Sequence, residues 1–180
     1  MESVRTAGER LKSLSSRILA AHADAATLQQ HTEEYHCYPV KWVSPHLERR
    51  REVGWDLYAV LGLTRDNKAG MYQQHRRNYA FFDAPVGLIF TIDWVMQRGS
   101  WLDYGMFWQN VMLVARARVL DTCPQAAFTQ FHRIISAELG LEGNEMVVCG
   151  MSLGFADTGK IENSLETERV PLEQFVKFSD

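Results

Sequence analysis

Residues 102–118 place apolar side chains on most turns of a helix, and this feature constrains the fold more than any other. A helix that is apolar this far around its circumference usually lies at the centre of its domain or at an interface between subunits. The apolar positions are Met106, Phe107, Val111, Met112, Val114 and Ala115. The sequence therefore predicts a long helix that is buried or interfacial.

Two short apolar runs predict strands on either side of this helix in the sequence. Residues 84–92 form a continuous apolar run rich in β-branched side chains, and residues 145–151 form a second one. Runs of this length that do not alternate with polar residues are typical of strands buried on both faces. We expect both segments to be central strands.

The remaining helices are predicted from apolar spacing and from caps. Residues 11–21 repeat apolar side chains at helical spacing, so the chain is expected to open almost at once into an amphipathic helix, with no strand before it. An aromatic, proline-containing stretch at residues 35–42 favours an extended loop. Capping residues predict three more helices. The first begins at Ser44-Pro45 and ends near Gly62, and the second begins at Asp66 and reaches about Tyr79. The third begins at Thr129 and reaches Leu139, before Gly140.

The order of these elements predicts one α+β domain over residues 1–180, without repeats or linkers. A formal net charge of -3 gives no electrostatic footprint for nucleic acid or an anionic membrane, and the arginine run at 49–51 is interpreted as a solvated helix face. No apolar stretch is long enough to span a bilayer. Cys37, Cys123 and Cys149 form no C-x-x-C pair, which favours free thiols in a reducing, cytoplasmic setting.

Common catalytic motifs are missing from the sequence. It contains no G-x-S-x-G elbow, no Walker A motif and no G-x-G-x-x-G fingerprint. No metal site is expected, because the six histidines are scattered without H-x-x-x-H or H-E-x-x-H spacing. Cys123 precedes a turn and can be imagined as a nucleophile, but without an identifiable histidine partner a small buried thiol is the favoured interpretation.

The segment LDTCPQAAF at residues 120–128 has features that suit a flat ligand. A proline and two small residues follow a buried helix and a short strand, so a planar ring can approach the backbone closely. Exposed backbone N–H groups at such a turn can donate hydrogen bonds to the ring. On spacing alone, however, a simple connecting turn is the favoured interpretation.

Several segments, in the same order, resemble the FMN-dependent nitroreductase family of NAD(P)H oxidoreductases. Residues 104–117 and 120–126 resemble its central helix and flavin-contacting turn, and the likeness runs in register from about Val4 to the C-terminus. The other segments that carry it are 77–85, 147–157, Asn163 and 167–173.

The resemblance implies a fold, a cofactor and site residues. The family has a central, mostly antiparallel sheet flanked by helices, and its members are obligate homodimers, with the long central helix at the interface and two FMN molecules bound there. By resemblance, the backbone of Pro124, Gln125 and Ala126 lies beside the isoalloxazine, and Arg169 reaches the FMN phosphate. The alternatives are that Gln125 only shapes the turn and that Arg169 is a surface residue. The resemblance implies no catalytic acid or base side chain and no metal ligand.

The sequence departs from the family at its start and at one turn. Members open with an R-R-S-x-R segment, a P-S-x-x-N-x-Q-P-W-like loop and a strand, all before the first helix, and this chain is expected to lack them. Ser3-Val4-Arg5 is a chance echo of the first motif. Val119 stands where the family commonly has glycine.

The leading functional hypothesis is a flavin oxidoreductase. Hydride passes from NADH or NADPH to FMN and then to an electron-poor acceptor such as a nitroaromatic or a quinone. Trp42, Trp55 and Trp108 either line the acceptor pocket or, as is commoner, pack in the core. The alternative is a non-catalytic dimeric binding module with weak or no flavin binding. A cysteine hydrolase built on Cys123 is a third reading, and it requires an exposed thiol with a depressed pKa.

Overall fold

The structure is a computed structural model that describes residues 2–179. The chain divides into two compact units. The first unit is made of Met1–Val40 and Lys68–Ala156, and the second of Lys41–Asn67 and Asp157–Asp180. The single domain expected over residues 1–180 stays a prediction.

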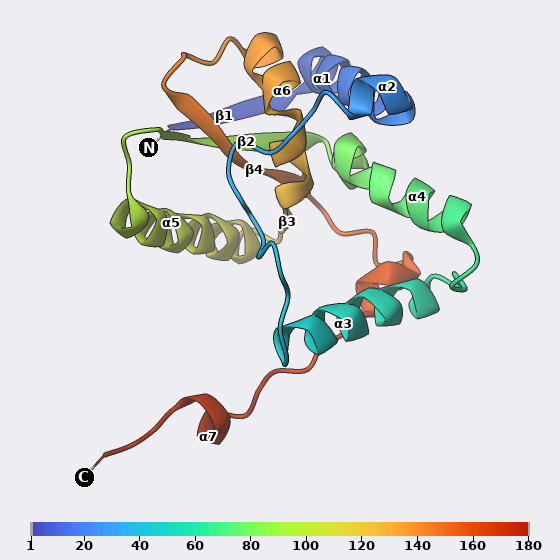
Figure 1. The fold of residues 1–180 in the computed structure, drawn as a ribbon, viewed down its shortest axis with the longest axis vertical. Helices are drawn as coiled ribbons and strands as arrows, with labels where there is room; N and C mark the ends of the chain where they lie inside the picture. The colour runs from blue at the N-terminus through green and yellow to red at the C-terminus, as the bar shows by residue number, and fades with distance from the viewer. Residues whose placement is uncertain (1, 180) are drawn as a thin grey trace. The chain divides into compact units, whose positions relative to one another are not determined.

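A four-stranded sheet lies at the centre of the first unit, in the order β1-β2-β4-β3 (Figure 1). The strands are β1 (Glu2–Ala7), β2 (Val86–Asp93), β3 (Asp121–Gln125) and β4 (Glu145–Gly154). Every neighbouring pair is antiparallel. The two predicted strands are confirmed as β2 and β4, and both are central in the sheet, which explains why their sequences are almost entirely apolar. The predicted α+β, mostly antiparallel fold is likewise confirmed.

Strand β1 corrects the expectation that no strand precedes the first helix. Its six residues pair antiparallel with β2, from Glu2 opposite Thr91 to Ala7 opposite Val86, and α1 follows directly at Gly8. An edge strand needs partners for its backbone on one side only, so a short, mostly polar sequence can occupy it. The segment shows none of the apolar alternation on which a strand prediction depends.

Five helices and two 3₁₀ segments belong to the first unit. They are α1 (Gly8–Ala23), α2 (Ala25–Leu28), α4 (Lys68–Arg76), η1 (Arg77–Asp83), α5 (Arg98–Ala117), η2 (Ala126–Phe131) and α6 (His132–Leu139). The second unit contains α3 (His46–Val60), η3 (Ile161–Ser164), which contacts α3, and α7 (Leu172–Phe175). Among the residues described, no helix is long and apolar enough to cross a bilayer.

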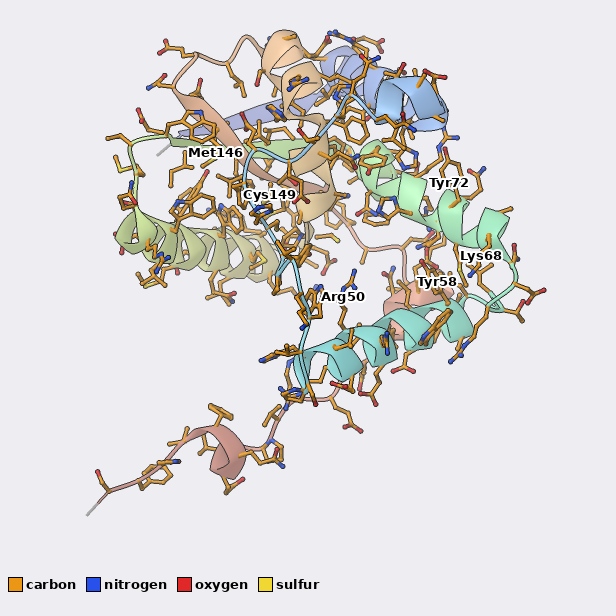
Figure 2. All side chains as sticks on the ribbon, viewed as in Figure 1. Arg50, Tyr58, Lys68, Tyr72, Met146 and Cys149 are labelled. Atoms are coloured by element: carbon orange, nitrogen blue, oxygen red, sulfur yellow. The ribbon has the colours of Figure 1, made fainter. Side chains whose placement is uncertain are left out.

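The core has one layer on each face of the sheet, with α1 and α6 on one side and α5 on the other (Figure 1). Buried side chains of the first layer are Leu11, Leu14, Ile18, Ala21, Tyr79, Phe81, Ile89, Phe128, Phe131, Ile135, Leu139 and Val147. Those of the second are Phe90, Ile92, Tyr104, Met146, Val148, Cys149 and Met151. Figure 2 labels Met146 and Cys149, which extend from β4 on the α5 side. The long helix predicted at residues 102–118 is confirmed as α5, which covers the second layer.

Three predicted helix starts or ends are wrong. The helix expected to reach Tyr79 ends at Arg76, because η1 turns the chain so that the Tyr79 and Phe81 rings are buried in the core. Thr129 does not cap α6; its hydroxyl donates to the Ala126 carbonyl inside η2 at 2.8 Å, and α6 begins three residues later. Pro45 is the N-cap of α3 instead of its first residue, and no side chain caps that helix. At η1 and η2, a 3₁₀ turn and the burial of aromatic rings thus move the helix end away from the residue that the local sequence favours as a cap.

The C-terminal turn of α5 holds Val119 in a left-handed conformation, with φ +61°. The Leu120 and Val119 N–H groups donate to the Ala115 and Arg116 carbonyls, which is the pattern of a Schellman motif. Glycine is the usual residue at this position, because a Cβ in the left-handed region clashes with the backbone. The valine at this family glycine position is therefore strained.

We expect Val119→Gly to stabilise the protein. The valine side chain is 68% exposed, so its removal loses little burial. Relief of the left-handed strain outweighs the added flexibility of glycine in the unfolded chain, for a net gain of about 1 kcal/mol. Urea unfolding measures the change, and Val119→Ala serves as the control, since it removes the side chain but keeps the strained Cβ. An equal gain in both variants would contradict the backbone explanation.

Candidate functional site

The predicted turn at Pro124, Gln125 and Ala126 lies where β3 ends and η2 begins. Strand β3 fixes the turn by pairing with β4, with Pro124 opposite Met151 and Gln125 opposite Gly150. The structure thus places these three sequence-predicted residues together on one short backbone segment against the central sheet.

The Gln125 side chain holds this turn in place from inside the protein. Its amide nitrogen donates to the Asn78 carbonyl at 2.7 Å, and its amide oxygen accepts from the Ser152 hydroxyl at 2.6 Å. The side chain is 2% exposed, so both hydrogen bonds are sheltered from water. Gln125 therefore links β3 to η1 and to β4 through its side chain, besides contributing its backbone to the turn.

The turn borders a cavity of about 340 Å³, within the range of small-molecule sites. Its wall comes from the loop after α2, from α5, from the β3–η2 turn and from β4. The lining residues are Tyr35, Cys37, Tyr38, Trp101, Tyr104, Gly105, Trp108, Pro124, Gln125, Ala126, Val148 and Cys149. Five of these twelve residues are aromatic.

Four titratable groups on this wall, on Tyr35, Cys37, Tyr104 and Cys149, are held in their neutral forms. Burial raises the pKa of the Cys149 thiol to about 12 and raises the pKa of Cys37 as well. Burial also raises the pKa values of the Tyr35 and Tyr104 phenols, whose O–H groups donate to the Val148 and Thr91 carbonyls at 2.6 and 2.7 Å. The described lining contains no acidic, basic or histidine side chain. The cavity suits a flat, apolar ring and offers no charged group for proton transfer at neutral pH.

Arg169, the fourth predicted site residue, belongs to the second unit, whereas the turn belongs to the first. Its guanidinium is exposed and donates to the Thr167 carbonyl at 3.0 Å and to the Thr167 hydroxyl at 2.5 Å. Its role toward a phosphate stays a prediction.

The three tryptophans considered for an acceptor pocket belong to different units of the chain. Trp108 lines the cavity, whereas Trp42 and Trp55 belong to the second unit. There, the Arg50 and Arg65 guanidinium groups lie over their rings, at 5.0 and 4.6 Å from the ring centres. These two rings are partners in cation–π contacts with arginine.

Cys123 does not have the properties of an activated nucleophile. The residue is exposed, so the expectation of a buried thiol is wrong, but the atoms packed around the sulfur raise the pKa of the thiol. A reactive thiolate needs the opposite shift. The cysteine-hydrolase hypothesis therefore loses its physical basis.

Sequence reasoning missed most of the cavity wall, including Tyr35, Cys37, Gly105 and Cys149. The available signals were the aromatic-rich stretch at 35–42 and the aromatic spacing at 101–108. Neither signal says that the loop after α2 folds against α5 and β4, because that contact joins segments far apart in the chain.

Comparison with known proteins identifies the family to which this chain is similar. The nitroreductase family model matches residues 4–155. A 4-nitrobenzoate reductase of Pseudomonas putida is 38% identical over 95% of this chain and 73% of its own length. A chloronitrobenzene nitroreductase of Comamonas testosteroni is 41% identical over 81% of this chain and 64% of its own length. The chain thus spans less than two thirds of the second relative's length.

Solved structures show the same relationship in three dimensions. The FMN- and NADPH-dependent nitroreductase NfnB from Sphigopyxis sp. strain HMH superposes with a TM-score of 0.93 at 32% identity, covering 99% of this chain and 79% of that one. NfnB from Mycobacterium smegmatis, solved in complex with NADPH, superposes with a TM-score of 0.91 at 26% identity, covering 99% and 78%. Sequence and fold agree over most of the chain, and this protein belongs to the nitroreductase family.

Proposed function

We propose that this protein binds FMN and acts as an NAD(P)H-dependent oxidoreductase that reduces nitroarenes. The observation that carries the proposal is the cavity beside Pro124, Gln125 and Ala126, whose wall is uncharged and largely aromatic. Such a wall accepts a planar aromatic ring. The named relatives act on nitrobenzoate and chloronitrobenzene, and the NfnB structures depend on FMN.

The residues present fit an isoalloxazine ring. The backbone of the β3–η2 turn forms one edge of the cavity, where a flat ring can lie against peptide groups. On α5, Gly105 also lines the cavity, and a Cβ added there would meet no atom within 4 Å outside the adjacent residues and the backbone of its own helix turn. The wall at Gly105 is therefore open, and any larger side chain would extend into free space.

When bound, FMN supplies hydride transfer from NADH or NADPH to the acceptor. The protein's own part is to orient the bound ring and to cover it. The Gln125 hydrogen bonds fix the backbone of the turn, and the Tyr104 and Trp108 side chains line the same cavity. No lining side chain is charged, so protons reach the acceptor from water or from the substrate's own solvation.

The proposed function also includes a partner for the FMN phosphate, a homodimer and a cellular setting. We propose that Arg169 pairs with the FMN phosphate, for which a guanidinium fork is well suited. The exposed apolar residues of α5, among them Leu102, Met106 and Leu113, support a homodimer built on that helix. A reducing, cytoplasmic setting fits three cysteines that are all free thiols.

A visible absorption spectrum of the purified protein, with and without added FMN, tests the proposal. We expect a bound-flavin spectrum that bleaches when NADPH or NADH is added without oxygen and recovers when nitrobenzene is added. A colourless protein that does not bind added FMN would overturn the oxidoreductase proposal. It would favour the alternative of a non-catalytic binding module.

The Gly105→Leu variant tests whether the cavity is the binding site. A leucine stabilises a helix relative to glycine by roughly 0.7 kcal/mol, so the fold is expected to hold. The same side chain adds bulk to the cavity lining, and we expect FMN affinity to fall by about tenfold or more, a loss of about 1.4 kcal/mol. FMN titration by fluorescence quenching measures this loss.

Gly99→Leu is the matched control for this variant. Gly99 lies in the first turn of the same helix, also with open space around it, but it does not line the cavity. We expect its FMN affinity to match that of the unaltered protein. Equal losses in both variants would mean that the helix surface, and not the cavity, governs binding.

A further inference from the structure

The three thiols of this chain differ in where they lie. Cys37 is half-buried and lines the aromatic cavity, and Cys149 lines the same cavity but is 3% exposed. Cys123 is exposed and lies outside the cavity lining. Cys37 is therefore the thiol that a molecule inside the cavity can reach, and Cys123 is the thiol most open to bulk solvent.

The proposed reaction generates a thiol-reactive product. Transfer of one hydride and one proton to a nitroarene releases water and leaves a nitrosoarene. The nitrogen of a nitrosoarene is electrophilic, and thiols add to its N=O bond. Because the reduction takes place beside Pro124, Gln125 and Ala126, this product forms in the cavity that Cys37 lines.

We propose that Cys37 is a covalent capture site for nitrosoarenes formed in this cavity. The inference rests on the proposed function for its source of nitrosoarene, but not for the reactivity of the site. The Cys37 sulfur bonds to the nitrogen, the N=O π bond breaks, and the thiol proton moves to the oxygen. The resulting N-hydroxysulfenamide rearranges to a sulfinamide, in which sulfur is oxidised and nitrogen reduced, with no atom gained or lost.

Cys37 is favoured as the reacting thiol because the cavity holds the aromatic molecule near its sulfur, and not because the thiol is ionised. Burial raises the pKa of this thiol, so it is mostly protonated at neutral pH and reacts slowly with reagents in bulk solvent. An aromatic molecule bound in the cavity, whose lining includes Cys37, Trp101 and Trp108, spends far longer near the sulfur than a freely diffusing one. The cavity should therefore make Cys37 selective for aromatic electrophiles.

Two reagents with opposite preferences test the site directly on the full chain. The purified protein is treated with nitrosobenzene, without NAD(P)H, and a second sample with iodoacetamide, which is small and not aromatic. Intact mass and peptide mapping then locate the modified cysteine. We expect nitrosobenzene to modify Cys37 roughly tenfold faster than Cys123, because the cavity raises its local concentration. We expect iodoacetamide to prefer the exposed Cys123.

Two variants identify which cysteine each reagent modifies. Cys37→Ser should slow the gain in mass from nitrosobenzene about tenfold, whereas Cys123→Ser should leave that rate in place and slow the reaction with iodoacetamide. Modification of Cys123 first by both reagents, or no gain in mass from nitrosobenzene, would overturn the capture site. The first result would show that exposure governs reactivity, and the second that the cavity does not bring nitrosobenzene to the Cys37 sulfur.

A turnover experiment separates this inference from the proposed function. The protein with FMN, NADPH and nitrobenzene should gain the mass of one nitrosobenzene at Cys37, and a large excess of glutathione in solution should reduce that gain only partly. A direct adduct without consumption of nitrobenzene would place the failure in the proposed function and leave the capture site standing. Consumption of nitrobenzene without an adduct at Cys37 would overturn capture during turnover.

Discussion

The Gly150→Ala variant is expected to lose about 3 kcal/mol of stability, the upper end of the usual cost of overpacking a core. A Cβ added at Gly150 would lie 2.3 Å from one carbon of the Phe128 ring and 2.7 Å from the next. That ring cannot move aside, because it is fully buried and stacks on Phe81 with the ring centres 4.4 Å apart. The strain must therefore displace β4 or η2.

The displacement should also reach the candidate site. Gly150 pairs with Gln125 across β3 and β4, and Phe128 belongs to η2, which continues the turn. Chemical denaturation measures the loss of stability, and FMN titration below the unfolding transition measures the loss at the site. Both losses are expected in the same variant.

Gly143→Ala is the control for the loss of a glycine. Gly143 is exposed, and a Cβ there would meet nothing within 4 Å. Its stability should stay within about 0.5 kcal/mol of the unaltered protein. A Gly150→Ala variant as stable as this control would show that Phe128 repacks at little cost, contrary to the packing described here.

The parts of the fold that could be predicted from sequence are those fixed by local patterns. Strands β2 and β4 are central, so their buried faces make unbroken apolar runs, and α5 carries apolar side chains around most of its circumference. Gly140 ends α6 with φ +69°, as a C-terminal glycine should. In each case the signal and the structure lie in the same segment.

The parts that could not be predicted depend on contacts between distant segments. Strand β1 is defined by the partner that it pairs with, and η1 by the core that buries Tyr79 and Phe81. At the site, the resemblance pointed to the backbone of Gln125, but the bonds from its side chain to Asn78 and Ser152 join three separate elements. No local pattern in the sequence reports such a link.

The Gln125→Glu variant should lose about 3 kcal/mol at neutral pH, because it buries a charge opposite a carbonyl oxygen. The introduced carboxylate can still accept from Ser152, but it cannot donate to the Asn78 carbonyl as the amide does at 2.7 Å. Burial and the facing carbonyl both favour the protonated carboxyl, so its pKa in the folded state lies above its unfolded value of about 4.3.

The sign of the pH dependence follows from that shift. A group whose folded pKa is raised contributes its full stability below the unfolded pKa and loses it as the pH rises through the folded value. Relative to the unaltered protein, Gln125→Glu should therefore recover stability as the pH falls from neutral toward about 4, because its protonated carboxyl can donate to Asn78. Denaturation at several pH values, always compared with the unaltered protein, measures this recovery. A deficit that does not change with pH would contradict the donor role of the Gln125 amide.

A double-mutant cycle with Ser152 separates the two hydrogen bonds of Gln125. Gln125→Leu leaves the Ser152 hydroxyl and the Asn78 carbonyl unpaired, and Ser152→Ala leaves the Gln125 oxygen unpaired. Each single change should cost about 1–3 kcal/mol, since a buried polar group loses its partner. The double variant removes both members of the Ser152–Gln125 bond, so its loss should be smaller than the sum by about 1 kcal/mol. Strictly additive losses would mean that the two side chains do not depend on each other. The contribution of Gln125 to the turn would then rest on its hydrogen bond to the Asn78 carbonyl, beside the pairing of β3 with β4.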